Sequence, residues 1–274
     1  MLYRVEDWDD AYANGPNIPQ GERWPQAWVE PARAFRDAMA ARGRFTPDIA
    51  YGDHARERLD LFLPEGEARG LVVFIHGGFW VRLDKSYWSD LAAGPVSRGW
   101  AVAMPSYTLA PEARVAEIGR QMARAVETAA GHVSGPIRLT GHSAGGHLAT
   151  RLVVDDGLLE RRVAARVERV VSLSGLHDLR PLLRTKLNDD VRLDAEEAAA
   201  ESPALLAPRT DVDVIAWVGG AEREEFLRQS ALLPNIWRGL GARTESVVEP
   251  DRHHFDVIDG LKRADSALTE ALLG

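Results

Sequence analysis

The sequence contains no cysteine among its 274 residues. This absence excludes disulfide bonds, thiolate metal sites and a cysteine nucleophile, and it is compatible with a reducing cytoplasm. Long apolar runs are missing too, because the longest pure stretch near the middle, residues 71–75, is only as long as a β-strand. We therefore expect no membrane-spanning segment and a cytoplasmic location.

Positive charge is also in short supply. The 33 basic residues against 41 acidic ones give a net charge of −8. This balance argues against nucleic acid or an anionic membrane as the main partner. Residues 1–10 are acidic and lack the apolar core of a signal peptide, so no such peptide is expected. The expected partner is a small molecule, and the sequence leaves open whether the chain forms a homodimer.

What the sequence does contain is a regular alternation of strand-length apolar runs with helical patterns. Strands are predicted at residues 46–51, 58–63, 70–76, 100–105, 136–141, 167–173, 212–218 and 243–248. Helices are predicted at residues 25–42, 86–98, 112–130, 143–155, 195–200, 222–240 and 264–273. This alternation predicts an α/β fold with a mostly parallel eight-stranded sheet, in which the first two strands could form an antiparallel edge.

The length and the regular pattern favour a single domain over residues 1–274. Residues 1–24 differ from the remainder because they combine glycine and proline with Trp8, Tyr12 and Trp24. We interpret them as an irregular N-terminal arm, and two roles stay open for it: an ordered tail packed on the body, or a partial lid over the site. No insertion elsewhere is large enough for a separate cap domain.

A G-x-S-x-G motif, residues 141–145, stands between a predicted strand and a predicted helix. In this context the motif is typical of a nucleophile elbow, in which the flanking glycines leave room for a sharp turn. The N-terminus of the following helix directs its free N–H groups at the serine oxygen. Ser143 is therefore the candidate nucleophile. The alternative is a glycine-rich strand-to-helix turn without chemistry.

A second glycine-rich motif, His76-Gly77-Gly78-Phe79-Trp80, follows the predicted strand at 70–76. It has the form of an oxyanion-hole loop, because glycine lets backbone N–H groups approach a tetrahedral oxyanion closely. Gly77 and Gly78 are the candidate donors, and the N–H of Ala144 is the third. The alternative is a tight turn after a buried strand. His76 is expected to be structural.

The general base is expected on a late loop, because a serine in a nucleophile elbow is followed along the chain first by the acid and then by the histidine. His253 and His254 follow the last predicted strand and occupy that loop. Their spacing alone does not choose between them. His177 also lies beyond Ser143 and is a candidate for lining the substrate pocket.

The acid is expected after the predicted strand at 212–218. Glu222 comes first in the loop and is best placed to orient an imidazole. Glu224 and Glu225 read as first-turn residues of the next helix, where negative charge suits the helix dipole. The alternatives that remain are Asp251, Asp256, Glu224 and Glu225.

Several aromatic residues lie on or near the same loops, namely Phe79, Trp80, Trp88 and Tyr107. They could form an aromatic wall for a substrate, although such residues are as often part of a core. No metal site is expected, since adjacent histidines diverge and no H-E-x-x-H motif is present. The chemistry that these residues suggest needs no cofactor.

Together these motifs resemble the kynurenine formamidase (arylformamidase) branch of the α/β-hydrolase superfamily, which is close to carboxylesterases of the same fold. The resemblance covers nearly the whole chain, because it extends beyond the two glycine motifs to Asp9-x-x-Tyr12, Ile18-Pro19, Tyr51-Gly52, residues 59–62, 172–179, 201–203 and 222–230, and His254-Phe255. It implies Ser143 as nucleophile, His254 as base and Glu222 as acid. The family commonly has aspartate at the position of Glu222.

The resemblance implies a serine hydrolase that cleaves an arylformamide such as N-formylkynurenine, a step of tryptophan catabolism, through an acyl-serine intermediate. The expected substrate is a small aromatic molecule with a formyl or acyl group. A short-acyl carboxylesterase is the alternative, because it would use the same three residues. A third hypothesis, a catalytically idle fold used for binding, is disfavoured by the intact set of serine, histidine and acid.

Overall fold

The computed structural model describes residues 4–274, so the first three residues of the predicted arm lie outside it. Within this part, the strands are β1 Phe45–Ala50, β2 Arg58–Phe62, β3 Leu71–Ile75, β4 Ala101–Pro105, β5 Ile137–His142, β6 Val167–Leu173, β7 Asp213–Gly219 and β8 Arg243–Glu249. Every predicted strand exists, and its ends agree with the prediction to within one residue.

The α-helices of the same part are α1 Trp8–Tyr12, α2 Trp24–Ala41, α3 Ala93–Ser97, α4 Val115–His132, α5 Ala144–Arg151, α6 Arg161–Ala164, α7 Asn188–Val191, α8 Ala195–Ala200, α9 Glu224–Gly239 and α10 Ala267–Leu273. Short 3-10 helices cover Gly15–Asn17, Gly21–Arg23, Lys85–Ala92, Arg180–Arg184, Pro203–Leu205 and Val257–Lys262. None of the described helices combines the length and the apolar character that a bilayer crossing requires.

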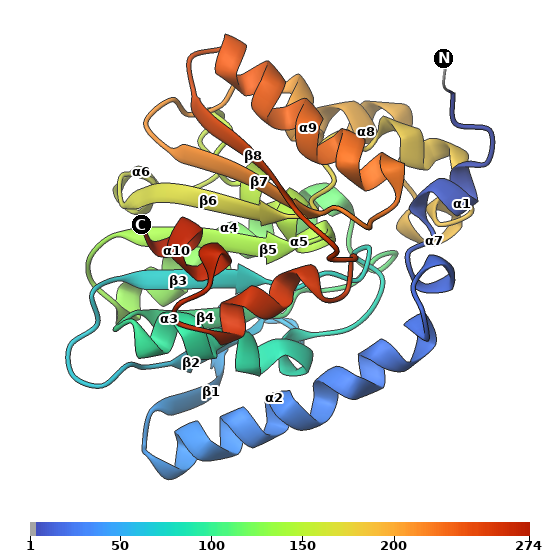
Figure 1. Ribbon diagram of the computed structural model, residues 1–274. Coiled ribbons are helices and arrows are strands. Elements are labelled where there is room, and N and C mark those ends of the chain that lie inside the picture. The colour runs from blue at the N-terminus through green and yellow to red at the C-terminus, as the bar shows by residue number, and fades with distance from the viewer. Residues whose placement is uncertain (1–3) are drawn as a thin grey trace.

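The strands form one sheet in the order β1-β2-β4-β3-β5-β6-β7-β8 (Figure 1). β2 is antiparallel to both β1 and β4, whereas the neighbours from β4 to β8 are parallel. The predicted sheet and its antiparallel edge are thus confirmed. Because parallel strands end at the same edge of the sheet, the loops after β3, β5, β7 and β8 meet there.

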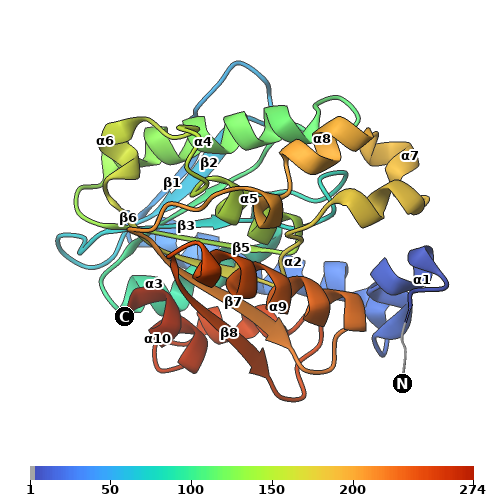
Figure 2. The same ribbon diagram turned by 90° about the horizontal axis from the view of Figure 1, so that it is seen from above.

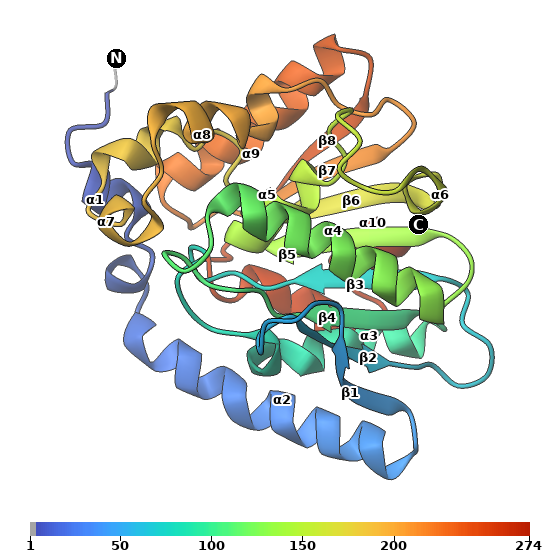
Figure 3. The same cartoon turned by 180° about the vertical axis from the view of Figure 1, so that it is seen from behind.

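Helices cover both faces of the sheet. α3 and α10 lie on the face that is in front in Figure 1, and α4 and α5 cover the opposite face, which Figure 3 shows. Side chains of β3 alternate between the two cores, with Leu71, Val73 and Ile75 in one and Val72 and Phe74 in the other. Burial on both faces explains why this strand is a continuous apolar run in the sequence.

The N-terminal arm is less irregular than predicted. Its first helix, α1, begins at a side-chain cap, because the carboxylate of Asp7 accepts the N–H of Asp10. α1 lies beside α9, and the arm then crosses the edge where the parallel strands end before it enters α2 (Figures 1 and 2). A helix of one turn has too few residues for its period to show in the sequence.

The predicted helix at 86–98 is a second difference. A 3-10 helix over Lys85–Ala92 precedes the short α3, and Trp88 inside it has a non-helical φ of −132°. The indole of Trp88 packs on Trp28 of α2, with ring centroids 5.1 Å apart. Packing against a distant helix therefore overrides the local helical pattern.

Candidate active site

Ser143 occupies the turn between β5 and α5 with φ 56° and ψ −118°. Such a conformation costs a non-glycine residue about 1–3 kcal/mol and persists only where the surroundings hold it. The N–H of Ser143 donates to the oxygen of Leu173 at 2.8 Å. A Cβ at Gly141 would overlap the oxygen of Gly145, and a Cβ at Gly145 would overlap the oxygen of Ile75. Glycine at both flanking positions is therefore a steric requirement of this turn.

The loop after β3 lies close to Ser143. A Cβ built on Gly77 would lie 3.2 Å from the Cβ of Ser143, and Gly78 has a φ of +108°. None of the backbone hydrogen bonds within residues 4–274 uses the N–H of Gly77 or Gly78. Ala144 is the first residue of α5, so its N–H has no partner inside the helix. Free N–H donors around a hydroxyl group are what an oxyanion hole requires.

The loops after β8 and β7 bring a histidine and a glutamate together. Nδ1–H of His254 donates to Oε2 of Glu222 at 2.6 Å, and the two side chains are only 3% and 0% exposed. The other carboxylate oxygen of Glu222 accepts from the hydroxyl of Ser174 and, at 2.9 Å, from the N–H of Gly219. This fixed partner at Nδ1 leaves Nε2 as the basic nitrogen of His254.

The other acidic candidates are engaged elsewhere or exposed. Glu225 accepts from the hydroxyl of Tyr12 at 2.7 Å, and Asp256 accepts from the N–H of His253 at 2.7 Å. Two further candidates are exposed to solvent, Glu224 and Asp251. Among these acids, Glu222 alone contacts His254.

The neighbouring histidine, His253, has a different environment from His254. Its ring packs edge-on against Trp24 with ring centroids 5.0 Å apart, and its Nδ1 accepts the N–H of Phe255 at 3.1 Å. The structure therefore brings His254, and not His253, into contact with an acid of the β7 loop.

Ser143 and His254 both line a cavity of about 360 Å³. Much of its wall is aromatic: Tyr12, Trp28, Phe79, Trp88 and Phe255. Because residues 12–16, 21 and 22 also line it, the N-terminal arm forms part of the cavity wall. No hydrogen bond within residues 4–274 engages the hydroxyl of Ser143.

Three residues expected at the substrate, Trp80, Tyr107 and His177, are not among those that line this cavity. Trp80 is fully buried and packs edge-on against the ring of His147. Tyr107 is also fully buried and donates its hydroxyl to the oxygen of His76 at 3.1 Å. His177 is held between Gln229 and the hydroxyl of Ser172. All three side chains are buried in contact with residues of the core or of neighbouring loops, whereas Phe79 lines the cavity.

The aromatic residues that the sequence did not point to come from distant segments. Trp28 lies on α2 and Phe255 directly follows His254, and both line the cavity. Asn14 of the arm also lines it, and its buried Nδ2 has no partner within residues 4–274. Of these three residues, only Phe255 could have been expected from the sequence, because it directly follows His254 in a late loop.

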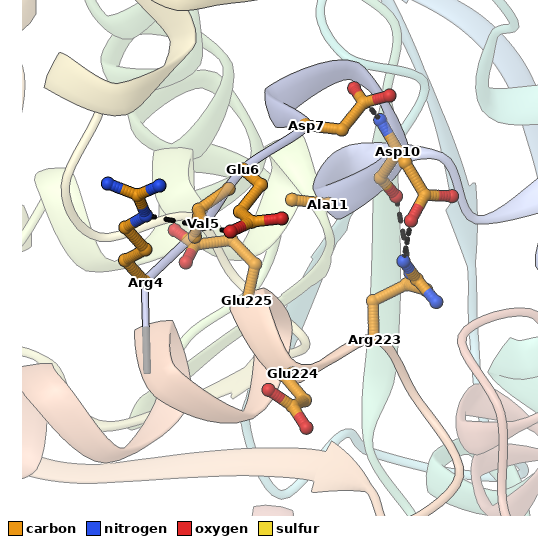
Figure 4. A pocket seen from close by; sticks show the side chains of 9 residues that line it. All are labelled: Arg4, Val5, Glu6, Asp7, Asp10, Ala11, Arg223, Glu224 and Glu225. Atoms are coloured by element: carbon orange, nitrogen blue, oxygen red, sulfur yellow. Dashed lines mark hydrogen bonds and ion pairs between the residues drawn. The ribbon is translucent and has the colours of Figure 1, made fainter. Parts of the chain in front are cut away.

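A larger cavity of about 740 Å³ lies away from Ser143, between residues 4–11 and the start of α9 (Figure 4). Figure 4 shows Arg223 pairing with Asp10 across its edge. This pair holds the arm next to the loop that carries Glu222. In residues 4–274 no three histidine, aspartate or glutamate side chains are grouped as a metal ion would need.

The sequence has relatives of known name. Residues 59–209 match the BD-FAE family. Kynurenine formamidase of Salmo salar is 31% identical over 241 residues, which cover 82% of this chain and 80% of the relative. Isoprenylcysteine alpha-carbonyl methylesterase ICME of Arabidopsis thaliana is 24% identical over 245 residues, which cover 76% of this chain and 56% of that protein.

Solved structures extend the comparison. A candidate thioesterase from Silicibacter sp. TM1040 is 46% identical with a TM-score of 0.93, over 98% of this chain and 99% of that one. The esterase of Pyrobaculum calidifontis, at 17% identity, shares the fold with a TM-score of 0.72, over 91% of this chain and 89% of that one. These comparisons show that the chain is a hydrolase and belongs to the kynurenine formamidase-like branch of the α/β-hydrolase superfamily.

Proposed function

We propose that the protein hydrolyses an arylformamide of the N-formylkynurenine type, with Ser143 as nucleophile, His254 as general base and Glu222 as the acid that orients it. The observation that carries this proposal is that His254, paired with the buried Glu222, lines one aromatic cavity together with the strained Ser143. The relatives named kynurenine formamidase support the choice of a formamide.

In the proposed reaction, Nε2 of His254 takes the hydroxyl proton as Oγ of Ser143 attacks the formyl carbon. The carbonyl oxygen becomes an oxyanion, and the N–H groups of Gly77, Gly78 and Ala144 hold it. His254 then gives its proton to the leaving amine as the C–N bond breaks. Water, deprotonated by His254, attacks the formyl-serine. The bond between the formyl carbon and Oγ then breaks, His254 returns the proton to Oγ, and formate leaves the restored Ser143.

The shape of the cavity supports an aromatic leaving group. A volume of about 360 Å³ lies at the small end of ligand pockets, and its aromatic side chains can stack on an aryl ring. A formyl group adds only one carbon and one oxygen at Ser143, so almost all of this space is available to the amine. The missing Ser143–His254 hydrogen bond is compatible with the mechanism, because such contacts often tighten only when substrate binds.

A short-acyl esterase is the second candidate function. Its support is the similarity to a methylesterase of Arabidopsis thaliana and the high structural similarity to a candidate thioesterase. Esters and thioesters would react through the same serine, so only the leaving group separates these activities.

The decisive experiment measures kcat/KM of the purified protein on N-formylkynurenine, p-nitrophenyl acetate and an acetyl thioester. We expect the formamide to be the best substrate. We expect Ser143→Ala to lower all measurable rates by about 10⁴-fold or more, and Ser134→Ala, at an exposed serine, to leave them unchanged. Efficient turnover of the ester or thioester with none of the formamide would rule out the formamidase assignment. Full activity of Ser143→Ala would rule out the mechanism.

A further inference from the structure

Two side chains of opposite charge line the Ser143 cavity without pairing with each other. Arg82 follows the loop after β3, and Glu22 belongs to the N-terminal arm. Both are exposed, and neither takes part in a side-chain hydrogen bond or ion pair within residues 4–274. A cation and an anion thus face one aromatic cavity from different elements.

The backbone of Arg82 has a fixed position relative to the candidate oxyanion loop. The N–H groups of Val81 and Arg82 both donate to the oxygen of Gly78, at 3.1 and 3.2 Å. A Cβ at Gly78 would overlap the oxygen of Arg82 and would lie 3.2 Å from its Cγ. The side chain of Arg82 therefore begins next to Gly78, in the candidate oxyanion loop near Ser143.

Glu22 also lines the cavity, and its backbone is held in place. It lies in the 3-10 helix Gly21–Arg23, whose first residue is packed so closely that a Cβ on Gly21 would overlap the oxygen of Gly15. The arm itself is tied to the body by the ion pair of Asp10 with Arg223 (Figure 4). The carboxylate of Glu22 therefore projects from an anchored segment.

Arg82 also borders a second cavity, whose wall includes the carboxylates of Asp9 and Asp190. Neither carboxylate lies within ion-pair distance of Arg82, and Asp9 instead accepts the N–H of Lys186 at 2.7 Å. The guanidinium is thus available to a ligand, and its planar fork matches a carboxylate in a bidentate arrangement.

We propose that Arg82 binds a carboxylate, and Glu22 an ammonium group, of the substrate's leaving group. The enzyme would then prefer aryl acyl compounds that carry an α-amino acid head remote from the scissile bond. This inference rests on the proposed function only in taking Ser143 as the nucleophile. It does not depend on whether the scissile bond is a formamide or an ester.

Two matched substrate pairs test the head group separately from the scissile bond. The formamide pair is N-formylkynurenine and 2′-formamidoacetophenone, which lacks the amino acid head. The ester pair is O-acetyltyrosine and p-tolyl acetate. We expect the zwitterionic member of each reactive pair to have the lower KM.

Arg82→Gln should raise KM for the zwitterionic substrates about tenfold or more, the size of effect expected for a charge-assisted hydrogen bond. KM for the neutral partners and kcat should change little, because this contact is the same in the ground and transition states. Arg82→Lys should recover part of the loss, since it restores the charge but not the planar fork. Glu22→Gln should raise KM for O-acetyltyrosine and leave that for p-tolyl acetate unchanged.

Arg42→Gln is the matched control, because Arg42 is an exposed arginine without a side-chain partner at the far end of α2. Equal KM changes for zwitterionic and neutral substrates in Arg82→Gln, or no change for either, would overturn the proposal. If the ester pair shows the preference while formamides do not react, the head-group site stands and the formamidase assignment fails. If formamides react without this preference, the formamidase assignment stands and the head-group site fails.

Discussion

At the scale of single residues, His142 shows how the proposed base, His254, is held in place. Its ring lies beside that of His254, with centroids 4.5 Å apart, and its Nε2–H donates to the main-chain oxygen of His254 at 2.8 Å. Burial lowers the pKa of His142 well below 6.5, so its ring stays neutral. His142 therefore holds the loop of His254 without placing a second positive charge near it.

Glu222 is the proposed acid, at a position where the family resemblance leads us to expect aspartate. Its extra methylene still lets it contact His254, Ser174 and Gly219 at once. We expect Glu222→Gln to lower kcat by about 10⁴-fold, because an amide at this position can favour the wrong tautomer of the imidazole. Steady-state kinetics on the best substrate provides the measurement.

The control for this prediction is Glu224→Gln, which changes an exposed glutamate of the first turn of α9. It should keep near-normal kcat. A Glu222→Gln variant with more than a tenth of normal kcat would show that another acid orients His254.

At the scale of elements, the elbow joins β5 to α5 with no spare volume. Gly145→Ala should destabilise the fold by several kcal/mol, because its Cβ would meet the backbone oxygen of Ile75, which cannot move away like a side chain.

Gly131 offers the opposite case within α4, since nothing lies within 4 Å of a Cβ there. Gly131→Ala should stabilise the protein by about 0.5–1 kcal/mol through helix propensity.

Urea unfolding of the two alanine variants beside the parent protein measures both effects. Equal midpoints for Gly145→Ala and the parent protein would contradict the steric account of the elbow. A loss of stability in Gly131→Ala would contradict the open space at that position.

At the scale of the whole molecule, buried histidines make folding sensitive to acid. Burial lowers the pKa of His76 and His177 to about 4 and that of His147 to about 3. Below about pH 6.5 the unfolded chain binds protons at these rings and the folded chain does not. The stability that they contribute is therefore complete above pH 6.5 and is lost as the pH falls towards 4.

We expect the free energy of unfolding to be lower at pH 5.5 than at pH 7.5 by about 1 kcal/mol for each such ring. Urea unfolding at the two pH values measures the difference. His147→Gln, which removes one ring, should reduce that difference by about 1 kcal/mol, whereas His132→Gln, at an exposed histidine, should not. The same pH dependence in His147→Gln and the parent protein would contradict the role of that ring.

The sequence by itself determined the strands, the longer helices and the two glycine motifs, because apolar periodicity and the steric freedom of glycine are local properties. It also limited the candidate base to two adjacent histidines and favoured Glu222, on the loop before α9, as the candidate acid. The short helices escaped prediction because four or five residues do not show a period.

Only the tertiary structure decided which side chains surround Ser143. Trp80, Tyr107 and His177 were all expected at the substrate. Their side chains are instead buried in the protein interior. Tyr12, Trp28 and Glu22 are far away in sequence and line the cavity, because the arm folds back across the ends of the parallel strands. Long-range packing, which no local pattern encodes, sets the wall that a substrate meets.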